Sequence, residues 1–321
     1  MTLEIGYTMM CEQAPPRQLV SDVARAEAAG FDFSVISDHY SPWLESQGHS
    51  PYAWSVLGAA AQATEQIPLM TYVTCPTVRY HPVVVAQKAA TVQELSEGRF
   101  TLGLGAGENL NEHVVGRGWP SVSIRHEMLE EATEIIARLL AGERVSFHGR
   151  HFTADAARLF DPPATPVPIG IAVSGPRACD LAGRRADLMI AVEPDASLGD
   201  LFDAAGGAGK PRVGQLPVCY AADRRRAVEL AHDQFRWFAG GWKVNADLPG
   251  PEAFAAASRF VRPDDVEASI ACGPDVERHR EAVRAFAEAG FTHLALVQIG
   301  HAQEGFLTWA EKELLPALKG L

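Results

Sequence analysis

Short apolar runs alternate with longer amphipathic stretches along the chain. Residues 3–7 form an apolar-rich run typical of a strand, and residues 16–29 carry apolar positions at helical spacing. Gly30 follows as a natural helix C-cap, and residues 31–37 form the next strand-like run. The pattern therefore predicts repeated pairs of one strand and one helix.

The same alternation extends to the end of the chain. It predicts strands at 3–7, 31–37, 68–75, 99–105, 167–173, 188–192, 213–220 and 293–299. It predicts helices at 16–29, 52–65, 82–96, 127–141, 176–185, 224–238, 274–289 and 305–318. Residues 147–166 form a polar, proline-rich loop, whereas residues 239–265 are irregular and rich in Gly, Pro and aromatic residues. We expect segment 239–265 to be an insertion that covers a functional site.

This rhythm favours a (β/α)8 TIM barrel, an α/β fold with its insertion segments at the C-terminal face of the strands. Such a barrel takes roughly 250 residues plus insertions, which fits one domain over residues 1–321. A doubly wound sheet is the alternative, but at this length it divides more often into two domains.

Charge and composition exclude several classes of partner. Lys and Arg total 28 against 40 Asp and Glu, a formal net charge of −12, so no basic surface for nucleic acid or anionic membranes is expected. No apolar run approaches the ~18 residues that span a bilayer, and the N-terminus lacks the features of a secretory signal. Five scattered cysteines without a C-x-x-C pair indicate reduced thiols in a cytoplasmic protein. The histidines lack metal-ligand spacing, so we predict no metal site and a small-molecule substrate.

Titratable residues follow two of the predicted strands. Barrel active sites lie at the C-terminal strand ends, where Asp38 and His39 follow the second strand and Glu108 follows the fourth. A histidine there can exchange a proton near neutral pH, but a loop pair bonded to backbone explains the position equally well. Glu108 is either a carboxylate at a helix N-terminus or a proton donor in the pocket. Trp43 either supports a flat ligand or packs beneath its loop.

Glycines and a helix start mark two further strand ends. Gly103, Gly105 and Gly107 do not match the dinucleotide fingerprint, because Glu108 would repel phosphate, but they would let a planar ring approach the backbone. Residues 174–177, Ser-Gly-Pro-Arg, begin a helix whose free N–H groups can bind an anion. An ordinary serine N-cap followed by proline accounts for the same residues.

Taken together, these segments resemble a known family. The carrying segments are 37–43 (SDHYSPW), 74–77 (TCPT) with 82–87, 103–112 (GLGAGENLNE) and 172–176 (AVSGP). They are similar to the coenzyme F420-dependent oxidoreductases of the luciferase-like superfamily, in the branch related to F420-dependent glucose-6-phosphate dehydrogenase. Weaker similarity extends from Ile5 to Pro316.

The resemblance implies a bound deazaflavin and a set of site residues. His39 would be the base that removes the substrate hydroxyl proton, Glu108 would protonate the ring at N1 after hydride transfer to C5, and Trp43 would shield the reacting groups. The cofactor-contacting positions would be Asp38, His39, Tyr72, Val73, Ala106, Gly107, Asn111, Ser174, Gly175 and Pro176. The bond between Tyr72 and Val73 matches a non-proline cis peptide of the family. Glu12, Trp43 and Lys243 would lie on the substrate side, and a homodimer is implied.

One departure bears on the substrate. Sugar-phosphate dehydrogenases of this family hold the phosphate with basic residues, but this chain is acidic over 192–195 and neutral at 268–269, and only Lys243 remains. The resemblance therefore favours an F420-dependent dehydrogenase or reductase acting on an alcohol, a sugar or a sugar phosphate that is held differently, and it disfavours glucose 6-phosphate. The alternatives are an FMN-dependent luciferase-like monooxygenase and a non-catalytic cofactor-binding barrel. The presence of both His39 and Glu108 argues against the latter.

Overall fold

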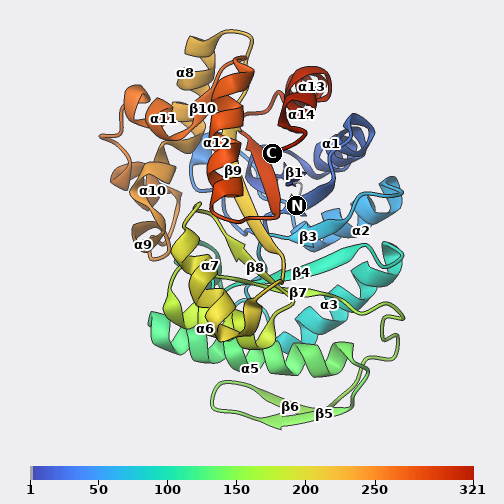
Figure 1. Cartoon of the computed structure of the whole chain (residues 1–321). Coiled ribbons are helices and arrows are strands. Elements are labelled where there is room, and N and C mark those ends of the chain that lie inside the picture. The colour runs from blue at the N-terminus through green and yellow to red at the C-terminus, as the bar shows by residue number, and fades with distance from the viewer. Residues whose placement is uncertain (1–2) are drawn as a thin grey trace.

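Eight parallel strands close into a barrel in the computed structural model, which describes residues 3–321 (Figure 1). In ring order they are β1 (Glu4–Met9), β2 (Phe33–Ile36), β3 (Leu69–Thr71), β4 (Phe100–Leu104), β7 (Ile169–Ala172), β8 (Leu188–Ala191), β9 (Arg212–Cys219) and β11 (His293–Gln298). The pairing of β8 with β9 completes the ring. The predicted (β/α)8 barrel is confirmed, including all eight of its strands.

Apolar side chains from strands all around the ring fill the barrel interior. This inner cluster contains Phe33, Val35, Met70, Tyr72, Leu188, Ile190, Val213 and Ala295. Gly6 of β1 makes room for it, because a Cβ at Gly6 would lie 2.5 Å from the Phe33 ring. The interior is therefore packed with side chains, which leaves the ends of the strands as the place for a site.

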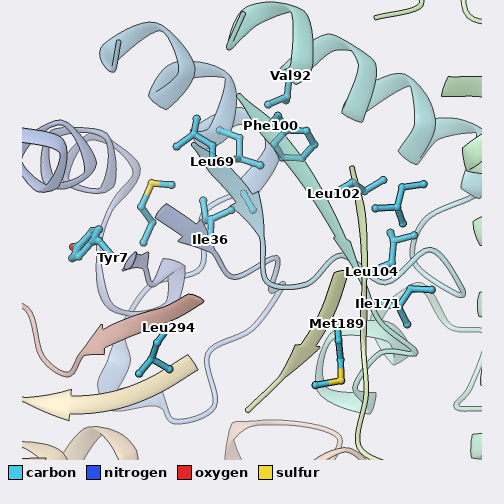
Figure 2. Close-up of a cluster of buried hydrophobic side chains, with 14 of the residues drawn as sticks. Tyr7, Ile36, Leu69, Val92, Phe100, Leu102, Leu104, Ile171, Met189 and Leu294 are labelled. Atoms are coloured by element: carbon cyan, nitrogen blue, oxygen red, sulfur yellow. The ribbon is translucent and has the colours of Figure 1, made fainter. Parts of the chain in front are cut away.

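Helices cover the outside of the barrel. They are α1 (Pro16–Ala29), α2 (Ala53–Ala63), α3 (Pro82–Leu95), α5 (Val122–Leu140), α6 (Pro176–Arg185), α7 (Ala196–Phe202), α8 (Arg224–Phe235), α12 (Val276–Glu288), α13 (Gln303–Trp309) and α14 (Leu315–Leu318). Figure 2 shows part of the apolar layer beneath them, where Leu69, Phe100 and Leu102 lie close to Val92 of α3. None of these helices, over the described part of the chain, is both long and apolar enough to cross a bilayer.

The prediction of a plain loop at 147–166 is wrong over its first half. Strands β5 (Val145–His148) and β6 (Thr153–Ala157) form an antiparallel hairpin beyond α5 (Figure 1). Glu131 of α5 accepts hydrogen bonds from the backbone N–H groups of Arg150, His151 and Phe152 at its tip. A carboxylate on the preceding helix therefore orders a polar segment whose own sequence resembles a loop.

Segment 239–265 is more regular than predicted. It contains α9 (Trp242–Asn245), α10 (Pro251–Ala257) and the start of α11 (Pro263–Ser269). These helices are too short to show a clear apolar period, and they gather with α8 on one side of the barrel (Figure 1). The predicted helix 224–238 ends as α8 at Phe235, and a short strand that was not predicted, β10 (Ala271–Cys272), pairs with the end of β9.

Candidate active site

Three side chains from three strand ends meet at the C-terminal face of the barrel. The Nδ1 atom of His39, after β2, lies 3.0 Å from Oε1 of Glu12, after β1. The Nε2 atom of His39 lies 3.5 Å from Oε2 of Glu108, after β4. The side chains of His39 and Glu108 are 11% and 12% exposed, whereas that of Glu12 is fully buried. The structure thus brings together the imidazole and the carboxyl group that the sequence singled out.

Burial changes the protonation of all three groups. It raises the pKa of Glu108 to about 8, helped by the neighbouring charges of Glu12 and Glu112. It raises the pKa of Glu12 to about 7, and Asp38 adds a smaller increase. The pKa of His39 falls to about 3, first through burial and then through the positive charge of Arg79. At neutral pH the imidazole is therefore neutral while Glu108 holds a proton.

Glu108 does not serve as a helix cap. It occupies the N-cap position of α4 (Asn109–Glu112), but its side chain makes no capping hydrogen bond. Its Oε2 instead accepts a long hydrogen bond, 3.4 Å, from Nδ2 of Asn111. The Oδ1 atom of Asn111 accepts from the backbone N–H groups of Tyr40 and Ser41. Asn111 therefore ties the loop that carries Glu108 to the loop that carries His39.

Glu12 is held from the other side of the imidazole. Its Oε2 accepts a 2.8 Å hydrogen bond from the Ser37 hydroxyl, and that hydroxyl accepts from the backbone N–H of Cys11. Its Oε1 faces Nδ1 of His39, but the two atoms are not aligned for a hydrogen bond. Glu12 thus lies against the imidazole, and its contact with a substrate stays a prediction.

Asp38 is occupied by protein donors. Its Oδ2 accepts hydrogen bonds from Trp54 Nε1 and the Thr74 hydroxyl, at 3.0 and 2.7 Å. Its Oδ1 accepts from Arg79 and Tyr80, at 3.1 and 3.2 Å. A carboxylate offers about four acceptor positions, so this one is filled. The side chain anchors the loop before His39, and a cofactor contact by Asp38 stays a prediction.

An aromatic wall stands beside His39. The Trp43 ring lies 4.3 Å from the His39 ring and stacks on Trp237, with centroids 4.2 Å apart and planes 13° apart. Trp237 comes from the turn after α8 and contacts Phe254 of α10 edge-on. The indole N–H groups of Trp43 and Trp237 are buried without a partner. The wall therefore joins the predicted covering segment to the candidate base.

Small residues form a smooth surface between β3 and β4. The peptide bond between Tyr72 and Val73 is cis, and the Tyr72 hydroxyl donates to the carbonyl of Ala191 across the barrel. A Cβ at Gly105 would lie 2.6 Å from Val73, and Gly107 has φ +88°, a conformation that favours glycine. Gly105 and Gly107 therefore make room for the side chains of Val73 and Cys75, and their closeness to a planar ring stays a prediction. Ala106 lies between them and is half-buried.

The start of α6 is open. Gly175, not Ser174, is its N-cap residue, and no side chain caps the first turn. A Cβ placed on Gly175 would meet no atom within 4 Å. Ser174 is exposed and Pro176 begins the helix, so the serine-cap interpretation is wrong.

Comparison with known proteins agrees with this architecture. The family model for luciferase-like monooxygenases matches residues 3–293. The chain belongs to the luciferase-like monooxygenase family. An F420-dependent glucose-6-phosphate dehydrogenase of Nakamurella multipartita is 35% identical over 99% of this chain and 97% of its own. An F420-dependent hydroxymycolic acid dehydrogenase of Mycobacterium tuberculosis is 37% identical over 89% and 80%.

A solved luciferase-like structure matches closely. An F420-dependent secondary alcohol dehydrogenase in complex with an F420–acetone adduct superimposes with a TM-score of 0.91 at 30% identity, covering 99% of both chains. The strand-end motifs therefore point to the correct family.

Sequence reasoning missed Arg79 and Trp237. Arg79 lies only two residues beyond the 74–77 motif. A charged residue in a loop that follows a strand was therefore a sign in the sequence that could have pointed to Arg79. Trp237 had no such signal, because only the folded chain stacks it on Trp43. Lys243 is exposed on α9, and its substrate role stays a prediction. Within residues 3–321, no three His, Cys, Asp or Glu side chains are grouped to hold a metal ion.

Proposed function

We propose that this chain is a coenzyme F420-dependent oxidoreductase that transfers a hydride between an uncharged alcohol or sugar and C5 of the deazaflavin. The observation that carries this proposal is the 3.5 Å distance between Nε2 of His39 and Oε2 of Glu108, in surroundings whose burial lowers the pKa of the imidazole and raises the pKa of the carboxyl group. Two proton-transfer groups at one strand-end face suit a reaction in which a hydroxyl loses a proton as its carbon loses a hydride. The F420-dependent relatives support the choice of cofactor.

The chain offers a suitable surface for the deazaflavin. Val73, Ala106 and Gly107 would lie against the ring, beside the cis peptide bond that joins Tyr72 and Val73. Gly175 and Pro176 would receive the acidic tail at the open start of α6, where N–H groups and the helix dipole favour an anion. Tyr72, Asn111 and Ser174 would support these contacts.

His39 and Glu108 would each carry out one of the two proton transfers of the reaction. When bound, the deazaflavin accepts or donates a hydride at C5. In alcohol oxidation, His39 would take the hydroxyl proton at Nε2, and Glu108 would pass its carboxyl proton to N1 of the ring that has received the hydride, which keeps the charges balanced. Trp43 excludes water from this region and holds the imidazole ring in place.

The substrate side of the site favours an uncharged molecule. Glu193 and Asp195 are exposed directly after β8, at the same face of the barrel. Asp195 caps α7 through the N–H of Ser197, which helps keep its carboxylate ionised and lowers its pKa. A phosphate dianion near these carboxylates would be repelled, so the substrate is an alcohol or an unphosphorylated sugar.

Absorbance measurements test the cofactor and the substrate separately. We expect F420 to bind and FMN not to compete, and we expect reduction of F420 by a secondary alcohol or glucose to exceed reduction by glucose 6-phosphate. Tight FMN binding with oxygen consumption would instead indicate a monooxygenase. F420 binding without turnover of any alcohol or sugar would indicate a cofactor-binding barrel. A homodimer and a cytoplasmic location remain predictions.

The aromatic wall gives a prediction for substrate affinity. Replacing Trp237 by alanine removes the ring on which Trp43 stacks, a contact worth about 1 kcal/mol beyond its buried area. We expect the KM for alcohol to rise about fivefold to tenfold, because Trp43 is then free to move. The Kd for F420, measured by fluorescence, should change little.

The neighbouring Trp242 supplies the control for this variant. It lies five residues further along, at the start of α9, but is 37% exposed, so Trp242→Ala should leave both constants near the wild-type values. An equal rise of KM and of the F420 Kd in Trp237→Ala would contradict a role on the substrate side.

A further inference from the structure

Arg79 connects two buried carboxylates beneath the candidate base. It lies in the loop between β3 and α3, and its side chain is only 8% exposed. Its Nη2 atom donates to the backbone carbonyl of Asp38 at 2.6 Å and to Oδ1 of Asp38 at 3.1 Å. Its Nε lies 3.5 Å from Oε1 of Glu112, and its backbone N–H donates to Oε2 of Glu112 at 2.7 Å. One guanidinium thus holds the peptide that leads into His39 and the end of α4.

The polar contacts of the Arg79 side chain go to protein groups. Its charge is opposed by the Asp38 and Glu112 side chains, both fully buried, and its guanidinium lies over the Tyr80 ring at 4.5 Å. Burial of such charges is tolerated only when they are paired and hydrogen-bonded. The arrangement therefore points to an internal task and not to binding of the cofactor or substrate.

We propose that Arg79 is a positioning residue for His39: it fixes the peptide from which His39 projects, and it supplies the positive charge that pairs with the buried carboxylates of Asp38 and Glu112. This inference rests on the proposed function for its catalytic meaning. The effect on the imidazole itself can be measured without any substrate.

The charges around His39 show why the guanidinium matters. The carboxyl groups of Glu12 and Glu108 touch the imidazole, and burial favours their neutral forms. The Asp38 and Glu112 carboxylates lie beyond them and are paired with Arg79.

The other titratable neighbours complete this environment. The Nζ atom of Lys88, on α3, lies 3.2 Å from the centroid of the Tyr80 ring, and its charge also acts on Asp38. Tyr52, Cys11 and Cys75 are neighbours whose burial raises their pKa and keeps them neutral.

Loss of Arg79 would remove positive charge from the surroundings of His39 and leave the buried carboxylates in excess. Two buried carboxylates would lose their main counter-charge, and a proton on His39 would become the nearest replacement. Burial and Arg79 both act to lower the pKa of His39, so a neutral side chain at position 79 should raise the proton affinity of the imidazole. A lysine would keep the charge but could not hold the Asp38 carbonyl, the Asp38 carboxylate and Glu112 in the same planar geometry.

An NMR titration of the full-length protein without cofactor tests this. In protein labelled at histidine ¹³Cε1, the His39 signal is assigned by its loss in His39→Ala. In Arg79→Met and Arg79→Gln we expect the protonated fraction of His39 at pH 5 to be about tenfold or more above wild type, equivalent to one pKa unit. In Arg79→Lys it should stay near wild type. Tyr80→Phe, which removes an uncharged donor to Asp38, is the matched control and should also leave it unchanged.

Kinetics with F420 and an alcohol provide the second measurement. The acid limb of kcat/KM should move to higher pH in the Met and Gln variants, whereas Arg79→Lys should lose at least about tenfold in kcat with the limb unmoved. Wild-type titration of His39 in folded Met or Gln variants would overturn the inference. If both variants fail to fold, a shifted limb in Arg79→Lys would overturn it. A shifted His39 titration in a protein that turns over no alcohol would leave the role of Arg79 standing and refute the proposed function.

Discussion

Alanine at position 39 is expected to lower kcat for alcohol oxidation by about 10²–10⁴-fold, the usual contribution of a positioned general base. His39 is suited to this role because its imidazole is neutral at physiological pH and lies between Glu12 and Glu108. Initial rates of F420 reduction at saturating alcohol measure the effect. Fluorescence titration of F420 should show binding to be retained, because the residues that we propose to lie against the ring, within 72–73 and 105–107, are untouched.

A second histidine variant controls for general damage. His148 is exposed on the β5–β6 hairpin, so His148→Ala should keep the wild-type rate. If His39→Ala also keeps the wild-type rate on a verified substrate, the base must be another group. A loss of F420 binding equal to the loss of rate would make His39 a cofactor contact and not a base.

Glutamine at position 108 is expected to lower the rate of alcohol oxidation and to abolish the pH dependence of that rate near pH 8. Glu108 supplies a proton only while protonated, and burial raises its pKa to about 8. In the wild-type enzyme, kcat/KM for alcohol oxidation should therefore fall as the pH rises through about 8. Glu108→Gln has nearly the same shape but no acidic proton, so we expect a loss of about 10²–10⁴-fold in rate and no limb near this pH.

The reverse reaction reverses the sign of the pH dependence. In ketone reduction the ionised form of Glu108 accepts the proton, so the rate should rise through the same pH range. The exposed Glu65 supplies a control, since Glu65→Gln should keep the limb. A limb near pH 8 that persists in Glu108→Gln would assign it to another group, for which Glu12, with a pKa raised to about 7, is the first candidate.

Much of the fold was predictable from local sequence. Buried parallel strands appear as short apolar runs, and amphipathic helices appear as a 3.6-residue period, so the eight strands were located correctly. Elements shorter than about two helical turns were not predictable in this way. The helices α9 and α10 depend on contacts with the short helical turn Arg236–Gly240, and the strand β10 depends on pairing with β9, which are tertiary contacts.

Part of the site was predictable for a related reason. In a parallel barrel all strands point the same way, so residues that follow different strands converge at one face. The positions of His39 and Glu108 after strands two and four were enough to expect them at that face, and the motifs around them indicated the family. What the sequence left open was whether Glu108 caps a helix, and the absence of a capping bond answers this.

The sequence by itself was enough to predict the barrel, the family, and the two residues His39 and Glu108 that meet at the site. This is because short stretches of neighbouring residues show where each strand lies and which side chains follow it. Only the tertiary structure decided the protonation of those groups, because a pKa depends on burial and on charges contributed by distant segments. Arg79, Glu112 and Trp237 influence His39 from three different connections of the barrel. These residues come close together only because the strands close into a ring. A short stretch of neighbouring residues carries no information about that closure.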